Sequence, residues 1–184
     1  MFARTPRLLL RPGFPEDAPA LAVAIADEAI ARNLANVPWP YSVRDAEAFL
    51  ACPRDPVLPS LLIFERGSGA PQLAGACGLG RRPSGSVELG YWIATPFWGR
   101  GYASEACAAM VDIARTLGIK SLEGSHFLDN PASGRVLEKL GFVPLGIVAP
   151  RMSCARGEAV PARLMRLELE ARNCDDDREE ALAA

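Results

Sequence analysis

The stretch at 87–103 reads V-E-L-G-Y-W-I-A-T-P-F-W-G-R-G-Y-A, and residues 104–118 continue it with S-E-A-C-A-A-M-V-D-I-A-R-T-L-G. This stretch predicts a strand, a glycine-containing loop and a helix. In the loop, Gly99 and Gly101 allow the chain to curl so that successive backbone N–H groups point into one concavity. The helix, expected to begin at about Ser104, adds free N–H groups and the positive end of its dipole. This arrangement predicts a diphosphate site; the alternative is a plain turn that needs glycine only for its backbone angles.

Two familiar phosphate-binding loops do not match this stretch. A P-loop ends in Gly-Lys-Ser/Thr, whereas here the helix begins with A-S-E at 103–105, which excludes a P-loop. A dinucleotide-binding fingerprint requires a strand that runs directly into G-x-G-x-x-G. Here T-P-F-W at 95–98 intervenes and Ser104 stands where the third glycine should be, so a dinucleotide site is disfavoured.

The loop W-G-R-G-Y-A at 98–103 resembles the Q/R-x-x-G-x-G/A acyl-CoA loop of the GNAT superfamily of N-acetyltransferases, with Trp98 in the Gln/Arg position. The segments E-L-G-Y-W-I, S-E-A and the opening T-P-R-L-L-L-R-P are similar to the RimJ/RimL-like branch, which contains ribosomal-protein N-terminal acetyltransferases. N-P-A-S at 130–133 and V-L-E-K-L-G-F at 136–142 resemble the second diagnostic motif of the superfamily. The resemblance spans residues 5–169 and implies a single GNAT domain.

Apolar periodicity and turn residues predict an α+β domain over residues 1–170, with a mixed, mostly antiparallel sheet of about six to seven strands. Strands are expected at 5–11, 60–65, 72–79, 87–93, 119–127, 143–148 and 162–169. Helices are expected at 16–32, 42–51, 104–117 and 131–140, a polar and mobile connection at 150–160, and a charged, disordered tail at 171–184. The helical crossover makes strands 87–93 and 119–127 a parallel pair, and the resemblance implies that this central pair is splayed.

Local signals place several helix ends and one helix face. Ser42-x-x-Asp45 is a capping pattern, Asn130 followed by proline reads as an N-cap, and Gly118 is expected to end the preceding helix. On the helix at 16–32, the side chains expected to face the core are Leu21, Ile25 and Ala29.

Composition excludes several classes of protein. A formal net charge of −2 gives no electrostatic footprint for nucleic acid. The longest apolar runs are far shorter than the ~20 residues of a membrane helix, and the N-terminus lacks a signal sequence, so we expect a cytoplasmic protein with no membrane partner. The five cysteines are odd in number and form no C-x-x-C pair, which argues against a disulfide framework and a metal site. A homodimer is compatible with the sequence.

Acetyl transfer to an amine needs a group that removes the proton of the amine, and Glu88 is the candidate base. Glu88 and Trp92 share one face of the central strand, which the resemblance places beside the thioester. The alternative is a glutamate that faces solvent. Glu105 is a poorer candidate, because in the first helical turn it complements the dipole and would repel a diphosphate.

The resemblance implies the remaining roles. Acetyl-CoA is the expected cosubstrate, and a backbone N–H of Ile93 or Ala94 is expected to stabilise the oxyanion. The loop and helix start would hold the cofactor through Trp98, Gly99, Arg100, Gly101, Tyr102, Ala103 and Ser104, together with Asn130 and Ser133. Many members use a tyrosine to protonate the thiolate, but the matching position is Leu137, so Ser133 is the candidate acid. Asn130 and Ser133 could instead be an ordinary N-cap and first-turn serine.

The acceptor site is expected between residues 33–42 and 150–160, with Trp39, Tyr41, Glu88 and Trp92 against the substrate. These walls carry few carboxylates, which a polyamine or aminoglycoside would need. We therefore expect an uncharged or singly charged amine, such as a peptide N-terminus or an amino-acid-like molecule. The alternative function is a non-catalytic CoA-binding regulatory module.

Overall fold

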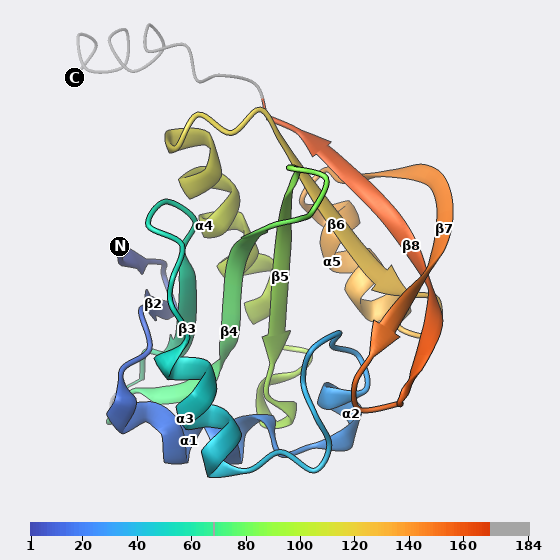
Figure 1. The fold of residues 1–184 in the computed structure, drawn as a ribbon. Coiled ribbons are helices and arrows are strands. Elements are labelled where there is room, and N and C mark those ends of the chain that lie inside the picture. The colour runs from blue at the N-terminus through green and yellow to red at the C-terminus, as the bar shows by residue number, and fades with distance from the viewer. Residues whose placement is uncertain (68, 170–184) are drawn as a thin grey trace, which may run out of the picture.

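The computed structural model describes residues 1–67 and 69–169, which form an eight-stranded sheet with helices on both faces (Figure 1). The strand order is β1-β2-β3-β4-β5-β6-β8-β7. The strands are β1 (Ala3–Arg4), β2 (Leu8–Arg11), β3 (Ser60–Glu65), β4 (Gln72–Arg81), β5 (Val87–Ile93), β6 (Ser121–Phe127), β7 (Val143–Ser153) and β8 (Glu158–Glu168). The helices are α1 (Ala18–Ile25), α2 (Glu28–Ala31), α3 (Val43–Ala51), α4 (Tyr102–Thr116) and α5 (Pro131–Lys139), with 3₁₀ turns at Pro15–Asp17 and Thr95–Phe97. The α+β class is confirmed.

The central strands separate, as expected. All neighbouring strands pair antiparallel except β5 and β6, which are parallel and pair only at Glu88 and Glu123. Beyond this point β5 and β6 do not pair, so the backbone groups on the facing edge of β5 are not used in the ladder with β6. The antiparallel meander β3-β4-β5 is confirmed as well.

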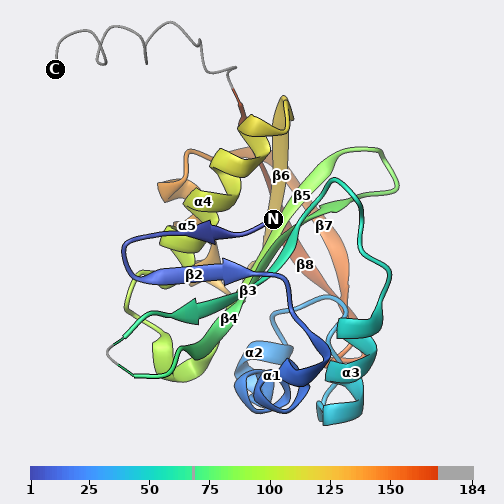
Figure 2. The ribbon, with the colours of Figure 1, turned by 90° about the vertical axis from the view of Figure 1, so that its left-hand side faces the viewer.

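The helices divide between the two faces of the sheet (Figure 2). Helices α4 and α5 pack on one face, where Met110, Leu122 and Leu137 are fully buried. Helices α1 and α3 pack on the other face against Leu62 and Phe64. Strand β6 and α5 approach closely through Gly134, because a Cβ there would lie 2.8 Å from Nε2 of His126.

The single helix expected at 16–32 is wrong, because the segment breaks into α1 and α2 around Asp27. The carboxylate of Asp27 accepts a hydrogen bond from the N–H of Ala29 at 2.8 Å and another from the Thr95 hydroxyl, which starts a new helix in a new direction. As a result Ala29 is exposed and Ile30 is buried instead, whereas Leu21 and Ile25 face the core as expected.

The strands at the two ends of the chain also differ from the expectation. The N-terminal strand is a short hairpin, in which β1 and β2 pair across a turn. The mobile connection expected at 150–160 is wrong: β7 and β8 continue through it as a hairpin that turns only at residues 154–157. Proline is tolerated in β7 because this strand lies at the edge of the sheet.

The expected helix caps are confirmed. Ser42 and Asp45 form a reciprocal capping box at α3, and the side chain of Asn130 accepts from the N–H of Ser133 at the start of α5. Gly118 follows the last turn of α4 with a φ of 71°. The tail expected at 171–184 lies outside the described residues. Within the described part of the chain, no helix is long and apolar enough to cross a membrane.

Candidate active site

The loop between β5 and α4 has the backbone of an anion-binding cradle. Gly99 and Gly101 lie in the left-handed region, with φ values of 74° and 78°, and Gly101 is the N-cap of α4. Only glycine adopts this region without appreciable strain, and the turn directs the following N–H groups outward. The helix begins at Tyr102, two residues before the expected start, so its free N–H groups lie directly beside the two glycines.

The N-terminal hairpin holds this loop in place. Glu105 turns away from the loop, and its carboxylate accepts from the Thr5 hydroxyl at 2.6 Å, from the N–H of Arg7 at 2.9 Å and from Nε of Arg7 at 2.7 Å. Arg7 Nη1 also donates to the carbonyl of Arg100 at 2.8 Å. Burial acts to raise the pKa of Glu105, but these bonds outweigh burial and lower the pKa. The negative charge is thus balanced by Arg7 and does not oppose an anion at the loop.

The side chain of Arg100 does not reach the concavity. Its Nη1 lies 3.1 Å from a carboxylate oxygen of Glu65, and its guanidinium lies over the ring of Phe97. The backbone of the loop, rather than this cation, therefore faces the cleft.

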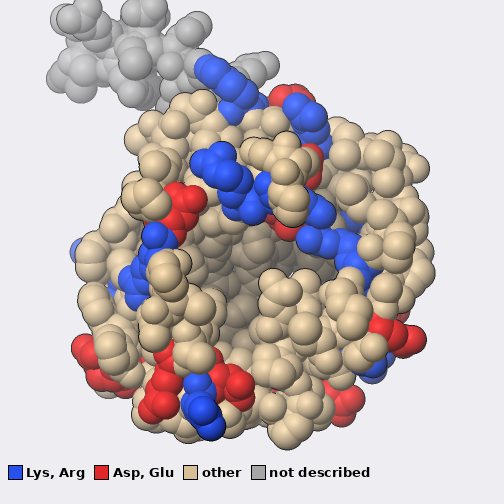
Figure 3. All heavy atoms as spheres, in the orientation of Figure 1, with Lys and Arg blue, Asp and Glu red and all other residues tan. Residues whose placement is uncertain are grey.

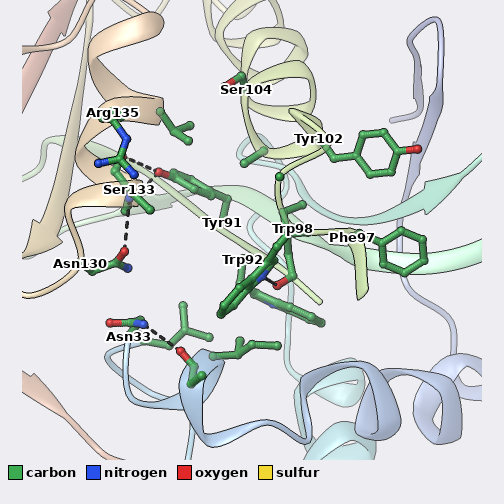
Figure 4. Close-up of a pocket in the computed structure, with 18 of the residues that line it drawn as sticks. Asn33, Tyr91, Trp92, Phe97, Trp98, Tyr102, Ser104, Asn130, Ser133 and Arg135 are labelled. Carbon is green, nitrogen blue, oxygen red and sulfur yellow. Dashed lines mark hydrogen bonds between the residues drawn. The ribbon is translucent and has the colours of Figure 1, made fainter. Parts of the chain in front are cut away.

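A cavity of about 820 Å³ opens between the loop, β5, α2 and α5 (Figure 4). Most residues expected at the cofactor line it: Ile93, Trp98, Gly99, Gly101, Tyr102, Ala103, Ser104, Asn130 and Ser133. Ala94 and Arg100 do not line it. Asn33 and Leu34, from the segment expected at the acceptor, line this cavity as well. Sequence reasoning missed the wall formed by α2 and the cations of α5, which are Ala29, Ile30, Arg32, Arg135 and Lys139.

The backbone of β5 distinguishes between the two candidate oxyanion donors. The N–H of Ala94 donates to the carbonyl of Ala74 in β4 at 2.8 Å, so it is occupied within the sheet. Because N–H groups alternate in direction along a strand, the N–H of Ile93 points to the opposite side, into the gap toward β6. The carbonyl of Ile93 points the same way and accepts from Nε1 of Trp98 at 2.6 Å, which ties the loop to the end of β5.

Tyr91 links the two sides of the gap, a contact that sequence reasoning missed. Its phenol oxygen lies 2.8 Å from Oγ and 3.0 Å from the carbonyl oxygen of Ser133 in the first turn of α5 (Figure 4). Burial is the main cause that raises the pKa of Tyr91 above its usual range, and the hydrogen bond to Ser133 opposes it only in part. The phenol therefore keeps its proton at neutral pH.

Glu88 is held by two arginines on the opposite face of the sheet from α4. Arg151 binds both of its oxygens, Arg82 Nη1 lies 3.2 Å from Oε1, and Ser125 Oγ donates to Oε1 at 3.1 Å. Burial, the largest single influence, raises the pKa of Glu88, but hydrogen bonding and charge from Arg151, followed by Arg82 and Ser125, outweigh it and hold this pKa below its usual range. Glu88 is therefore an ionised, partly buried carboxylate, neither a solvent-facing side chain nor a free one.

A smaller cavity of about 160 Å³ connects this carboxylate to the cleft. It shares Asn33, Leu34, Tyr91, Asn130 and Ser133 with the large cavity and reaches Glu88 and Arg151. Seen from the side of α1 and α3, the molecule is hollowed over β5, with basic side chains along the upper and right-hand rim (Figure 3). Of the expected acceptor residues, Trp92 lines the large cavity and Glu88 the small one, whereas Trp39 and Tyr41 line neither.

Comparison with known families shows to which family the chain belongs. The family model described as an acetyltransferase (GNAT) domain matches residues 7–143, which is most of the chain. The chain belongs to the GNAT acetyltransferase family. The GNAT enzyme is 27% identical over 153 residues to the uncharacterized N-acetyltransferase p20 of Bacillus licheniformis, covering 78% of this chain and 83% of p20. Its match to the uncharacterized N-acetyltransferase YoaA of Bacillus subtilis is 36% identical but spans only 67 residues, 36% of this chain and 38% of YoaA.

Solved structures support the same assignment of the fold. RimL, a ribosomal L7/L12 alpha-N-protein acetyltransferase in complex with coenzyme A, superposes with a TM-score of 0.74 at 20% identity, covering 93% of this chain and 99% of RimL. The RimJ/RimL-like branch expected from the sequence is thus found among the structural neighbours of this GNAT enzyme.

In the GNAT enzyme, the turn of the β7–β8 hairpin closes over the end of β6. Arg156 donates to the carbonyl of Arg32 at 2.8 Å and to Asp129 at 2.6 and 3.1 Å, and the N–H of Cys154 donates to the carbonyl of Ala35 at 3.0 Å. These bonds join the hairpin to the segment after α2. Both expected acceptor walls therefore contact each other; from the first, Asn33 and Leu34 line both cavities, and from the second, Arg151 lines the small one.

Proposed function

We propose that this GNAT enzyme is an acetyl-CoA-dependent N-acetyltransferase that transfers the acetyl group directly to a primary amine. The observation that carries the proposal is that the left-handed glycine loop, the N-terminus of α4 and the free edge of β5 all face one cavity. A diphosphate fits the first two features and an extended amide-bearing arm fits the third. That the neighbouring RimL structure contains coenzyme A supports this assignment.

The residues present suit coenzyme A. Backbone N–H groups from Gly99 to Ser104 would bind the diphosphate, and Arg135 and Lys139, which line the same cavity, would offset further phosphate charge. The edge of β5 would pair with the amides of the pantetheine arm. When bound, acetyl-CoA supplies the activated acetyl group, and all other chemistry falls to the residues of this chain.

Two groups at the gap have roles in the transfer itself. The N–H of Ile93 is directed into the gap and would donate to the oxyanion that forms when the amine attacks the thioester. Ser133, beside the same gap, would give its proton to the departing thiolate. Asn130 keeps its structural role as the N-cap of α5 while its side chain borders both cavities.

Glu88 would accept the proton that the amine loses, directly or through a water molecule. Its position in the small cavity supports this role, because that cavity shares Tyr91, Asn130 and Ser133 with the large one and so offers the amine a route between Glu88 and the thioester. The lowered pKa keeps Glu88 ionised through the neutral range, although it also makes the carboxylate a weaker base.

The pH profile of kcat/KM should identify Glu88. Because its pKa is lowered, activity that depends on Glu88 is present above that pKa and is lost as the pH falls through it. Arg151→Leu removes the main cause of the lowering, so burial should then raise the pKa and move the acidic limb to higher pH. Glu88→Gln should abolish this limb.

If activity is lost at low pH because the substrate amine becomes protonated, the loss should occur at the same pH in the wild type and in both variants. If the profiles of wild type, Arg151→Leu and Glu88→Gln coincide, Glu88 has only a structural role.

The acceptor is an uncharged or singly charged amine, such as a protein or peptide N-terminal α-amine or an amino-acid-like molecule. In the small cavity the carboxylate of Glu88 is already balanced by Arg151 and Arg82, so it does not offer the fixed negative charge that a polycation requires. A single thiol-release assay over N-terminal peptides, amino acids, polyamines and aminoglycosides tests this choice. The highest kcat/KM should fall among the first two groups; a polyamine or aminoglycoside at the top would contradict it.

A further inference from the structure

The hydroxyl groups of Tyr91 and Ser133 form a pair at the point where the two cavities meet. Both residues line both cavities, one from β5 and the other from α5, so the pair bridges the gap between the splayed strands. Leu137, the residue at the position where the resemblance would lead one to look for a tyrosine, is fully buried in the core. The phenol of Tyr91 is therefore brought to the cleft from a different element.

One arrangement of the protons satisfies both contacts of the phenol at once. The carbonyl oxygen of Ser133 can only accept, so at 3.0 Å it takes the single proton of the phenol. The phenol oxygen is then free to accept from Oγ of Ser133 at 2.8 Å. In this state Ser133 is turned toward Tyr91, and its hydroxyl has to rotate before it can reach a leaving group in the cleft.

Because the phenol oxygen lies within hydrogen-bond distance of both acceptors, its proton can move from the carbonyl to Oγ by rotation about the C–O bond alone. A serine hydroxyl is far less acidic than a phenol. Ser133 can therefore give up its proton more readily when a second proton reaches Oγ at the same time.

We propose that Tyr91 acts through Ser133 as the second member of a two-hydroxyl relay, an inference that rests on the proposed acetyl transfer. As the C–S bond breaks and its electron pair goes to sulfur, Oγ–H of Ser133 protonates the sulfur and the phenol of Tyr91 restores the proton on Oγ. The phenolate then recovers a proton from solvent, which balances the one released by the amine. Tyr91 is thus a positioning and proton-supplying residue that need not touch the acetyl group.

Tyr91→Phe tests the relay because it removes one hydroxyl and keeps the ring that packs against the core. It should lower kcat about 10-fold, the change expected from losing one hydrogen bond of ordinary strength, with the KM for acetyl-CoA unchanged. When Tyr91→Phe is added to Ser133→Ala, kcat should fall no further, because the two hydroxyls act in the same proton-transfer path. The solvent isotope effect on kcat should change from a two-proton to a one-proton dependence.

Thr116→Val is the control, since it removes a hydroxyl that donates to the carbonyl of Asp112 at 3.0 Å near the end of α4 and lines neither cavity. It should leave kcat and the isotope effect unchanged. If the wild type transfers acetyl groups but Tyr91→Phe keeps full kcat, or if its effect adds to that of Ser133→Ala, the relay is wrong. If the wild type acetylates no amine, the proposed function itself fails.

Discussion

Gly101→Val should abolish measurable coenzyme A binding, weakening it by ~100-fold or more, equivalent to about 2.7 kcal/mol. Gly101 has a φ of 78° and its next residue starts α4, so valine would either strain the cradle or turn its N–H groups away from the cavity. A β-branched side chain would also press on Arg7, whose Nη2 lies 3.5 Å from the position of a Cβ at residue 101 and which holds the loop through the carbonyl of Arg100. Isothermal titration calorimetry with coenzyme A measures the effect.

Gly118→Val is the control for this substitution. Gly118 has a φ of 71°, lies beyond the other end of α4 and faces open space, so valine there carries a similar backbone penalty without touching the cavity. It should lower the melting temperature but leave coenzyme A binding intact. Arg100→Ala should also have little effect on affinity, because Arg100 faces Glu65. Normal binding by Gly101→Val would place the diphosphate elsewhere.

Ser133→Ala should lower kcat by ~10²-fold, the usual effect of losing one general acid, with little change in the affinity for coenzyme A. Ser133 lies at the junction of the two cavities, and its Oγ has Tyr91 as its partner. The alanine preserves the helix, because Asn130 caps α5 through the backbone N–H of residue 133. Steady-state kinetics and calorimetry on the same preparation separate the two quantities. An unchanged kcat would return Ser133 to a structural role.

The part of the fold that local signals specify could be predicted from the sequence. The glycines at 99 and 101, the capping box at Ser42 and the N-cap at Asn130 each act within a few residues, so their elements begin within two residues of the expected positions. The break between α1 and α2 was missed because the Thr95 hydroxyl that helps to fix Asp27 is 68 residues away. The strands β7 and β8 were expected, but residues 150–160 were predicted to be a polar connection because the ladder that extends both strands through them has no local signal.

The candidate site, too, could be predicted only in part. The backbone cradle is formed by residues adjacent in sequence and was predicted, whereas the side chains that contact Glu88 and Ser133 come from distant parts of the chain and were not. Arg151 is 63 residues from Glu88, and Tyr91 is 42 residues from Ser133, so neither contact has a local signal. Both contacts matter for the proposed chemistry. The contact with Arg151 lowers the pKa of Glu88, the proposed base, and the contact with Tyr91 turns the hydroxyl of Ser133, the proposed acid, toward the phenol.

The most direct test of the account is to follow a labelled acetyl group from acetyl-CoA in the presence of the wild-type enzyme and an N-terminal peptide. We expect the label to appear in the α-amide of the peptide, with one thiol released for each acetyl group transferred. Coenzyme A that binds to the enzyme while the label stays in the thioester, with every amine tried, would contradict catalysis and favour a CoA-binding regulatory module.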